Sequence, residues 1–194
     1  MKIHRPDTRL APGLSAAHRV LLSSTTIIDV NVAEIIFTLS PLYNYFEILI
    51  RDLRCTSDDV SVAIAVGNAI TDIIISNDYN WANWRSSLAG ATLESVVGDN
   101  SIKLVQSAIG EGVGNAEGEG FNAEIFLNNP HRITNFFSLQ AKTVIVNATN
   151  GSVSHSFVNG TLNLAQPIDR VSITFTAGNF SSGVVQHYGI TGGV

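Results

Sequence analysis

The residue types that could carry out catalysis are present in this chain, but their spacing does not form a known catalytic pattern. A nucleophilic serine of the Gly-x-Ser-x-Gly type is absent from the sequence. Asp58 and Asp59 are the only adjacent carboxylates, and neighbouring residues of a strand point to opposite faces, so we interpret this pair as a solvated turn. We therefore expect no catalytic residues and no enzymatic activity, with a glycan-active enzyme as the least favoured alternative.

The histidines and a glycine-rich tract are the candidates for binding metals or anions. No two of the five histidines have the close spacing of zinc ligands; they are His4, His18, His131, His155 and His187. The tract from Gly110 to Gly120 has the glycines of a phosphate-binding loop, but its glutamates would repel an anion. It also lacks the Asp-rich spacing of a calcium loop. We interpret it as a flexible or partner-contacting loop, with calcium as the lesser alternative, and expect no cofactor and no metal site.

Tyr79, Trp81, Trp84 and Arg85 form the one aromatic cluster that could stack on a sugar. Alternation along an extended segment puts Tyr79 and Trp81 on the same face, and Trp84 could follow on a turn. Aromatic residues also dominate protein cores and subunit interfaces. The sequence leaves both interpretations open. Packing in a core or interface is favoured, and contact with a host-surface glycan is the alternative.

The charges divide the chain into a basic arm and an acidic body. The arm contains Lys2, Arg5, Arg9 and Arg19, and its prolines interrupt any helix or central strand. The whole chain carries a formal net charge of −5, which argues against binding to nucleic acid. We predict an extended anchoring arm over residues 1–22 and a single folded domain over residues 23–194.

Within the body, apolar residues alternate with polar or small ones at a period of two. The pattern is clearest in residues 61–66 and 171–176, with further candidates at 34–39, 46–53, 102–105, 121–127, 143–146 and 184–188. The sequences Asn128-Asn129-Pro130, Asn150-Gly151 and Asn159-Gly160 predict turns. Residues 86–97 come closest to a helical spacing, but Gly90 weakens it, and we predict a loop or short turn there. About nine or ten short strands predict an all-β protein, an antiparallel, jelly-roll-like β-sandwich.

The composition indicates how such a domain is stabilised and where it is found. Only 14% of the residues are charged, against about 25% in an ordinary soluble protein. Cys55 is the only cysteine, so stability must come from packing or oligomerisation rather than from an internal disulfide. The sequence contains neither an apolar run long enough to cross a membrane nor a signal-peptide pattern. We expect a protein made in the cytoplasm that does not insert into membranes.

The most specific motif lies near the end of the chain. Residues 168–190 read IDRVSITFTAGNFSSGVVQHYGI. This ending resembles the closing hairpin of a family of bacteriophage virion β-sandwich proteins, in which a GNF-S-SG turn and a terminal YGI recur. Less specific similarities are found in Tyr45–Ile50, in residues 78–81 and in residues 118–130, so that the resemblance covers roughly residues 43–190.

The resemblance implies a structural protein on the surface of a virion that assembles in a bacterial host. The expected roles are a capsid decoration protein, a head fibre or a tail appendage. Such a subunit would form a homotrimer and would be held to other virion proteins by its N-terminal arm. The alternative is a receptor-binding tail protein that recognises host carbohydrate through exposed loops.

Overall fold

The computed structural model describes residues 18–70, 72–74, 76–87, 90–105, 112–134, 136–146 and 153–191, with the side chains of residues 29 and 30 excepted. These residues form thirteen β-strands and contain no helix. The all-β class predicted from the sequence is therefore confirmed. Within the described part of the chain there is accordingly no helix long and apolar enough to span a membrane.

The strands are numbered in sequence order. They are β1 (His18–Val32), β2 (Glu34–Thr38), β3 (Tyr45–Cys55), β4 (Val62–Asn68), β5 (Asp72–Ile73), β6 (Tyr79–Ser87), β7 (Gly90–Asp99), β8 (Ile102–Val105), β9 (Phe121–Asn128), β10 (Phe137–Val146), β11 (Val153–Leu162), β12 (Arg170–Phe175) and β13 (Phe180–Thr191).

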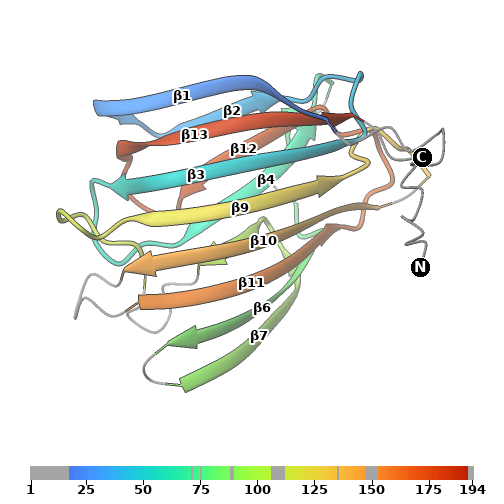
Figure 1. The fold of residues 1–194 in the computed structure, drawn as a ribbon. Coiled ribbons are helices and arrows are strands. Elements are labelled where there is room, and N and C mark those ends of the chain that lie inside the picture. The colour runs from blue at the N-terminus through green and yellow to red at the C-terminus, as the bar shows by residue number, and fades with distance from the viewer. Residues whose placement is uncertain are drawn as a thin grey trace, which may run out of the picture.

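The strands form two antiparallel sheets that pack face to face (Figure 1). The large sheet has eight strands in the order β1-β13-β3-β9-β10-β11-β6-β7. The small sheet has five strands, in the order β2-β12-β4-β5 with β8 also paired to β4. The chain passes repeatedly from one sheet to the other, for example from β1 to β2 and from β2 to β3. This architecture is the antiparallel β-sandwich predicted from the sequence.

Alternation of side chains along each strand builds the core between the sheets. In β9, Phe121, Ala123, Ile125 and Leu127 are buried, while the residues between them point to the outer face of the large sheet. The small sheet lies behind one part of the large sheet, and the edge strand β7 extends past it (Figure 1). Every residue of β7 is accordingly at least partly exposed.

The first strand begins before the predicted boundary between arm and body. His18 pairs with Thr191, and the antiparallel ladder continues as far as Val32 opposite Phe180. Residues 18–22 of the predicted arm therefore belong to an edge strand of the large sheet. The apolar residues Val20, Leu21 and Leu22 extend the strand pattern into the segment whose basic charge suggested a free arm.

The prediction of a loop over residues 86–97 is wrong. This segment forms the end of β6 and most of β7, which pair as an antiparallel hairpin from Tyr79 opposite Asp99 to Ser87 opposite Gly90. Gly90 adopts a φ of 123° at the start of β7, so the residue that weakens a helix here begins a strand instead. Cross-strand pairing of Trp84 with Leu93 and of Trp81 with Val96 favours the extended form.

Of the three turns predicted from Asn, Gly and Pro, one is present in the structure, one is not, and one lies outside the described residues. The turn at Asn128-Asn129-Pro130 is confirmed, because Asn129 has a φ of 43° and follows the last residue of β9. Asn150 and Gly151 lie outside the described residues. The turn predicted at Asn159-Gly160 is wrong, because both residues lie within β11. The absence of a side chain at Gly160 makes room for Ile102 of β8, since a Cβ there would lie 2.5 Å from the Cδ1 atom of Ile102.

The closing segment of the chain is not a hairpin between paired strands. β12 pairs with β2 and β4 in the small sheet, whereas β13 pairs with β1 and β3 in the large sheet. The turn between them, which includes Gly178 at a φ of 71°, therefore carries the chain across the core. Each strand turns its apolar side chains toward the other sheet, as the contact of Phe175 with Phe180 at 4.7 Å between ring centroids shows.

Replacing Gly160 tests the packing of β11 against β8. Gly160→Val should lower the free energy of unfolding by about 1–3 kcal/mol, because the new side chain overlaps buried Ile102. Ile102→Ala alone should cost about 2–5 kcal/mol by leaving a cavity. The double variant should lose less than the sum, since valine occupies part of the vacated space. Urea unfolding measures all three variants, and strictly additive losses would contradict this packing.

Candidate functional site

The aromatic cluster predicted from the sequence is divided between the core and the surface. Tyr79 and Trp81 are buried. The Tyr79 hydroxyl accepts a hydrogen bond from the Val66 amide at 2.9 Å, and the indole of Trp81 donates one to Asp99 at 2.9 Å. Burial raises the pKa of Tyr79 to about 12. These two residues therefore stabilise the fold and cannot stack on a sugar.

Arg85 is also buried, and alternation along β6 places it on the inner face of the strand with Tyr79 and Trp81. Trp84 lies on the opposite, outer face and is 45% exposed. Its ring lies 5.7 Å from that of Phe157 in β11, which is 47% exposed. The structure thus replaces the predicted cluster by a pair of exposed aromatic rings from neighbouring strands.

This aromatic pair borders a depression in the outer face of the large sheet. A groove of about 300 Å³ is lined by Phe126, Gln140, Ala141, Lys142, Phe157, Val158 and Asn159. A second groove of about 400 Å³ shares Lys142 and extends across β9 to β3, where Leu49, Arg51, Asn122 and Glu124 line it. The outward alternation of Phe157 in β11 is the sequence signal for this site, but the sequence does not show that β11 pairs with β6.

The arm residues predicted to anchor the protein differ in their positions. Lys2, Arg5 and Arg9 lie outside the described residues. Arg19 lies in β1, where its Nε is 2.6 Å from Oε2 of Glu47 in β3. Its guanidinium also lies 3.8 Å above the ring centre of Tyr188 in β13. Arg19 therefore links the edge strand β1 to β13 and β3 across the outer face of the sheet and is not part of a free arm.

Glu47, the partner of Arg19, is buried although it lies on the outer face of β3. Burial raises its pKa, and the positive charge of Arg19 opposes that shift. The Glu47 carboxylate forms an ion pair with Arg19 that joins β3 to β1. We assign it no catalytic role.

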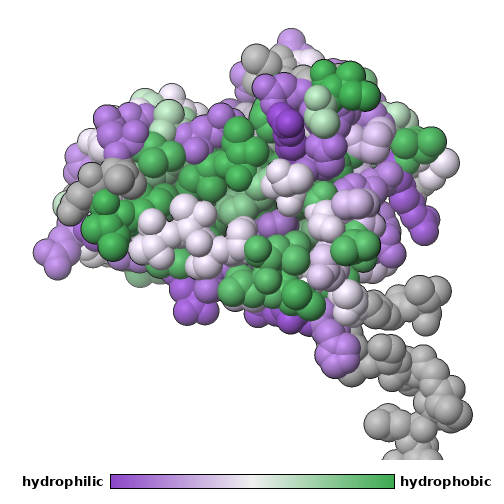
Figure 2. Space-filling model, turned by 90° about the horizontal axis from the view of Figure 1, so that it is seen from above, coloured by the Kyte–Doolittle hydropathy of each residue, from purple (hydrophilic) through white to green (hydrophobic). Residues whose placement is uncertain are grey.

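One long edge of the sandwich is apolar and open. β1 and β2 are end strands of their sheets, and no described strand pairs with their outer edges. Figure 2, which looks onto this edge, shows hydrophobic side chains gathered along it. The exposed members are Val20, Leu21 and Ile28 of β1 and Ile36 of β2. We call this surface the β1–β2 edge.

A second apolar surface lies at the end of the sandwich where β1 begins and β13 ends (Figure 1). Its exposed residues lie in the loops there and are Leu42, Ile70, Ile133 and Phe136. We call this surface the terminal end. Ile70 is 94% exposed.

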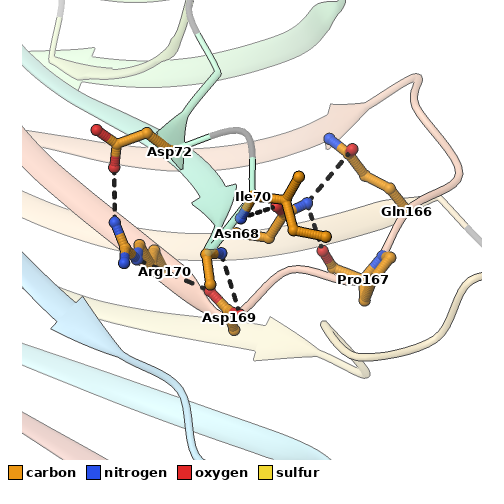
Figure 3. Close-up of polar contacts among 8 residues, drawn as sticks. Asn68, Ile70, Asp72, Gln166, Pro167, Asp169 and Arg170 are labelled. Atoms are coloured by element: carbon orange, nitrogen blue, oxygen red, sulfur yellow. Dashed lines mark hydrogen bonds and ion pairs between the residues drawn. The ribbon is translucent and has the colours of Figure 1, made fainter.

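Polar contacts hold the loop that carries Ile70 (Figure 3). The side chain of Asn68 donates a hydrogen bond to the Pro167 carbonyl at 3.3 Å and accepts one from the Ile70 amide at 2.9 Å. Arg170 pairs with Asp72 at 2.7 Å. The loop after β4 is thereby tied to the segment before β12, so that Ile70 projects from a constrained turn.

The other residues considered in the sequence analysis are the potential metal ligands, the Asp58-Asp59 pair, the glycine-rich tract and Cys55. No group of three or more His, Cys, Asp or Glu residues in the described part of the chain could hold a metal ion. Asp59 lies in a turn with a φ of 51°, and its carboxylate accepts a hydrogen bond from the Gly112 amide at 2.7 Å. Residues 110 and 111 of the glycine-rich tract lie outside the described residues. The hydrogen bond to Gly112 connects the described part of the tract to the Asp58-Asp59 turn. Cys55 is buried at the end of β3, and burial raises the pKa of its thiol.

His187 is a buried titratable group on the inner face of β13. It is 2% exposed and lies against the rings of Phe46 and Phe37, at centroid distances of 5.5 and 5.3 Å. Its Nε2 has no hydrogen-bond partner among the described residues. Burial lowers the pKa of His187 to about 4. The ring is therefore neutral in the folded protein over most of the acidic range.

Comparison of the chain with known proteins gave no match: no family model, no curated protein and no solved structure is similar to it. The resemblance of its last residues to phage virion proteins therefore stays a prediction.

His187 makes stability depend on pH. The unfolded chain takes up a proton near pH 6.5, the folded chain only near pH 4, so stability present above pH 6.5 is lost as the pH falls between these values. The loss attributable to this group should reach roughly 3 kcal/mol at pH 4. Denaturant unfolding at several pH values should show a weaker pH dependence for His187→Phe. Exposed His155, replaced by Gln, is the control, and identical pH dependence in all three proteins would exclude this role for His187.

Proposed function

We propose that this chain is a structural subunit on the surface of a bacteriophage particle. Its role would be that of a capsid decoration protein, a head fibre or a tail appendage. The subunit assembles as a homotrimer, and its N-terminal segment attaches it to other virion proteins. The observation that carries the proposal is the open, apolar β1–β2 edge.

An open edge of this kind requires a partner. Edge strands expose rows of unpaired amide and carbonyl groups, and natural proteins protect them with charge, proline, bulges or covering segments. The β1–β2 edge has two register irregularities in β1, but it also carries exposed apolar side chains, including Ile28, which is 69% exposed. Exposed apolar side chains gathered along an open edge are a feature of interaction sites in soluble proteins. Burial of this edge against another subunit removes both the apolar surface and the free strand edges from water.

Identical copies of the chain are the partner that best satisfies this requirement. In a closed ring, the β1–β2 edge of each subunit packs against its neighbour, so that no copy retains an uncovered β1–β2 edge. Such burial also supplies stability to a domain whose one cysteine, Cys55, is a free thiol. The weakly charged surface, with 14% charged residues, suits close packing of like subunits because little like-charge repulsion opposes it.

The terminal end supports attachment to the particle. The N-terminal segment joins the sandwich at His18, beside the last pair of β13. The exposed apolar residues of the terminal end, among them Ile70 and Leu42, lie in loops at the same end of the sandwich. A partner protein could bind the basic N-terminal segment and these loops together. Three such contacts in a trimer would act as one multivalent anchor.

The β1–β2 edge can be tested by adding charge to it. Ile28→Lys combined with Ile36→Lys should convert the assembly into monomers, because charged ammonium groups would be desolvated at the interface. Light scattering after size-exclusion chromatography should give three times the chain mass of 20.7 kDa for the wild type and one chain mass for the variant. Val97→Lys, at the exposed opposite edge of the large sheet, should remain trimeric. A wild type that is monomeric at all concentrations would refute the assembly.

The location on a particle requires a direct measurement. Immunogold electron microscopy, with an antibody against residues 18–191, should label phage particles from a bacterial culture that carries the gene. Label over the head would establish a decoration or head-fibre role, and label confined to the tail would establish a tail appendage. Cells that express the chain but particles that carry no label would refute the proposed function.

A further inference from the structure

The outer face of the large sheet carries a depression that the assembly role does not use. Its two grooves lie side by side over β11, β10, β9 and β3, joined at Lys142. The strand β13 separates this region from the edge strand β1. The first groove, at about 300 Å³, has the size of a small ligand pocket, for which typical volumes are about 300–1,000 Å³.

One wall of the depression is aromatic. Phe157 lines the first groove, and the ring of Trp84 lies beside it at an interplanar angle of 35°. Both rings are about half exposed, although burial of aromatic surface is favourable. On the other side of the groove, Phe126 of β9 adds a third ring. Half-exposed aromatic rings carried on paired strands can contact the apolar C–H faces of pyranose rings.

The floor of the depression offers hydrogen bonds of both kinds. Gln140 and Asn159 lie opposite each other on β10 and β11, and each amide both donates and accepts. Lys142 adds a donor, and Glu124, which is 3.9 Å from it, adds acceptors. A sugar hydroxyl is itself both donor and acceptor. The side-chain amides of Gln140 and Asn159 and the exposed Lys142–Glu124 pair can therefore form hydrogen bonds with a row of sugar hydroxyl groups.

Other ligand classes fit this surface less well. A nucleic acid requires clustered cationic groups for its phosphates, whereas here Lys142 is paired with Glu124. An extended peptide binds most readily along a free strand edge, but β11, β10, β9 and β3 are each paired on both sides. A saccharide needs neither feature. It requires aromatic faces for its rings and neutral polar groups for its hydroxyls.

We infer that the outer face of the large sheet binds an oligosaccharide, with one sugar ring stacked on Phe157 and Trp84 and its hydroxyl groups bonded to Gln140, Asn159 and Lys142. The chain continues over the second groove toward Arg51 and Asn122. This binding activity does not depend on a virion role and does not require the trimer. It replaces the predicted glycan site at Tyr79, Trp81, Trp84 and Arg85, of which only Trp84 belongs to the new site.

The test is binding of the full chain to a glycan array that holds both bacterial surface polysaccharides and short oligosaccharides such as maltotriose, cellotriose and chitotriose. At least one glycan should bind, and its affinity is then measured by calorimetry. Phe157→Ala should weaken that affinity about tenfold, as should Trp84→Ala. Binding of the bacterial polysaccharides alone would identify a cell-surface ligand, and binding of the short sugars would identify a free saccharide.

The matched control is Phe136→Ala, which removes an exposed phenylalanine from a loop at the terminal end. It should leave the affinity unchanged. All three substitutions are at exposed positions, so thermal unfolding should show an unaltered fold. The inference is overturned if no glycan on the array binds, or if Phe157→Ala and Trp84→Ala bind as tightly as the wild type.

Discussion

The structure depends on the removal of one face of each sheet from water. Phe46, Ile48 and Ile125 of the large sheet and Ile64 and Val171 of the small sheet are fully buried between them. Each buried side chain of this size contributes about 1.5–3 kcal/mol relative to exposure. Because strands alternate, this requirement also fixes which residues can reach the surface. Tyr79 and Trp81 are drawn into the core, and Trp84 is left outside by the same alternation.

The same burial determines the electrostatics of the interior. His187 lies beside aromatic rings because its position in β13 points inward, and burial favours the neutral ring, whose Nε2 has no polar partner among the described residues. Arg19 and Glu47 illustrate the opposite case on the outer face. Their ion pair is formed where Tyr188 shields one side and water reaches the other. Charge is thus tolerated on the outer face even where Glu47 itself is buried.

Local pattern in the sequence was sufficient for the fold class but not for contacts between distant strands. The period of two identified β9 and β12 because it reflects burial, which acts on every residue of a strand. It could not show that Ile102 of β8 would approach Gly160, and a local Asn-Gly preference therefore predicted a turn in the middle of β11. For the same reason the cluster around Trp84 was assigned to one segment, since its true partner, Phe157, is far along the chain.

The three candidate surfaces occupy different parts of the sandwich, and this separation follows from its topology. The β1–β2 edge exists because the chain places β1 and β2, which follow each other in sequence, at the ends of both sheets. Several loops lie at the terminal end because successive antiparallel strands bring the chain back to the same end of the sandwich. The two grooves of the outer face lie over β3, β9, β10 and β11, and β13 separates them from the edge strand β1. Subunit contacts at the edge and an anchor at the terminal end would therefore leave that outer face accessible to a ligand.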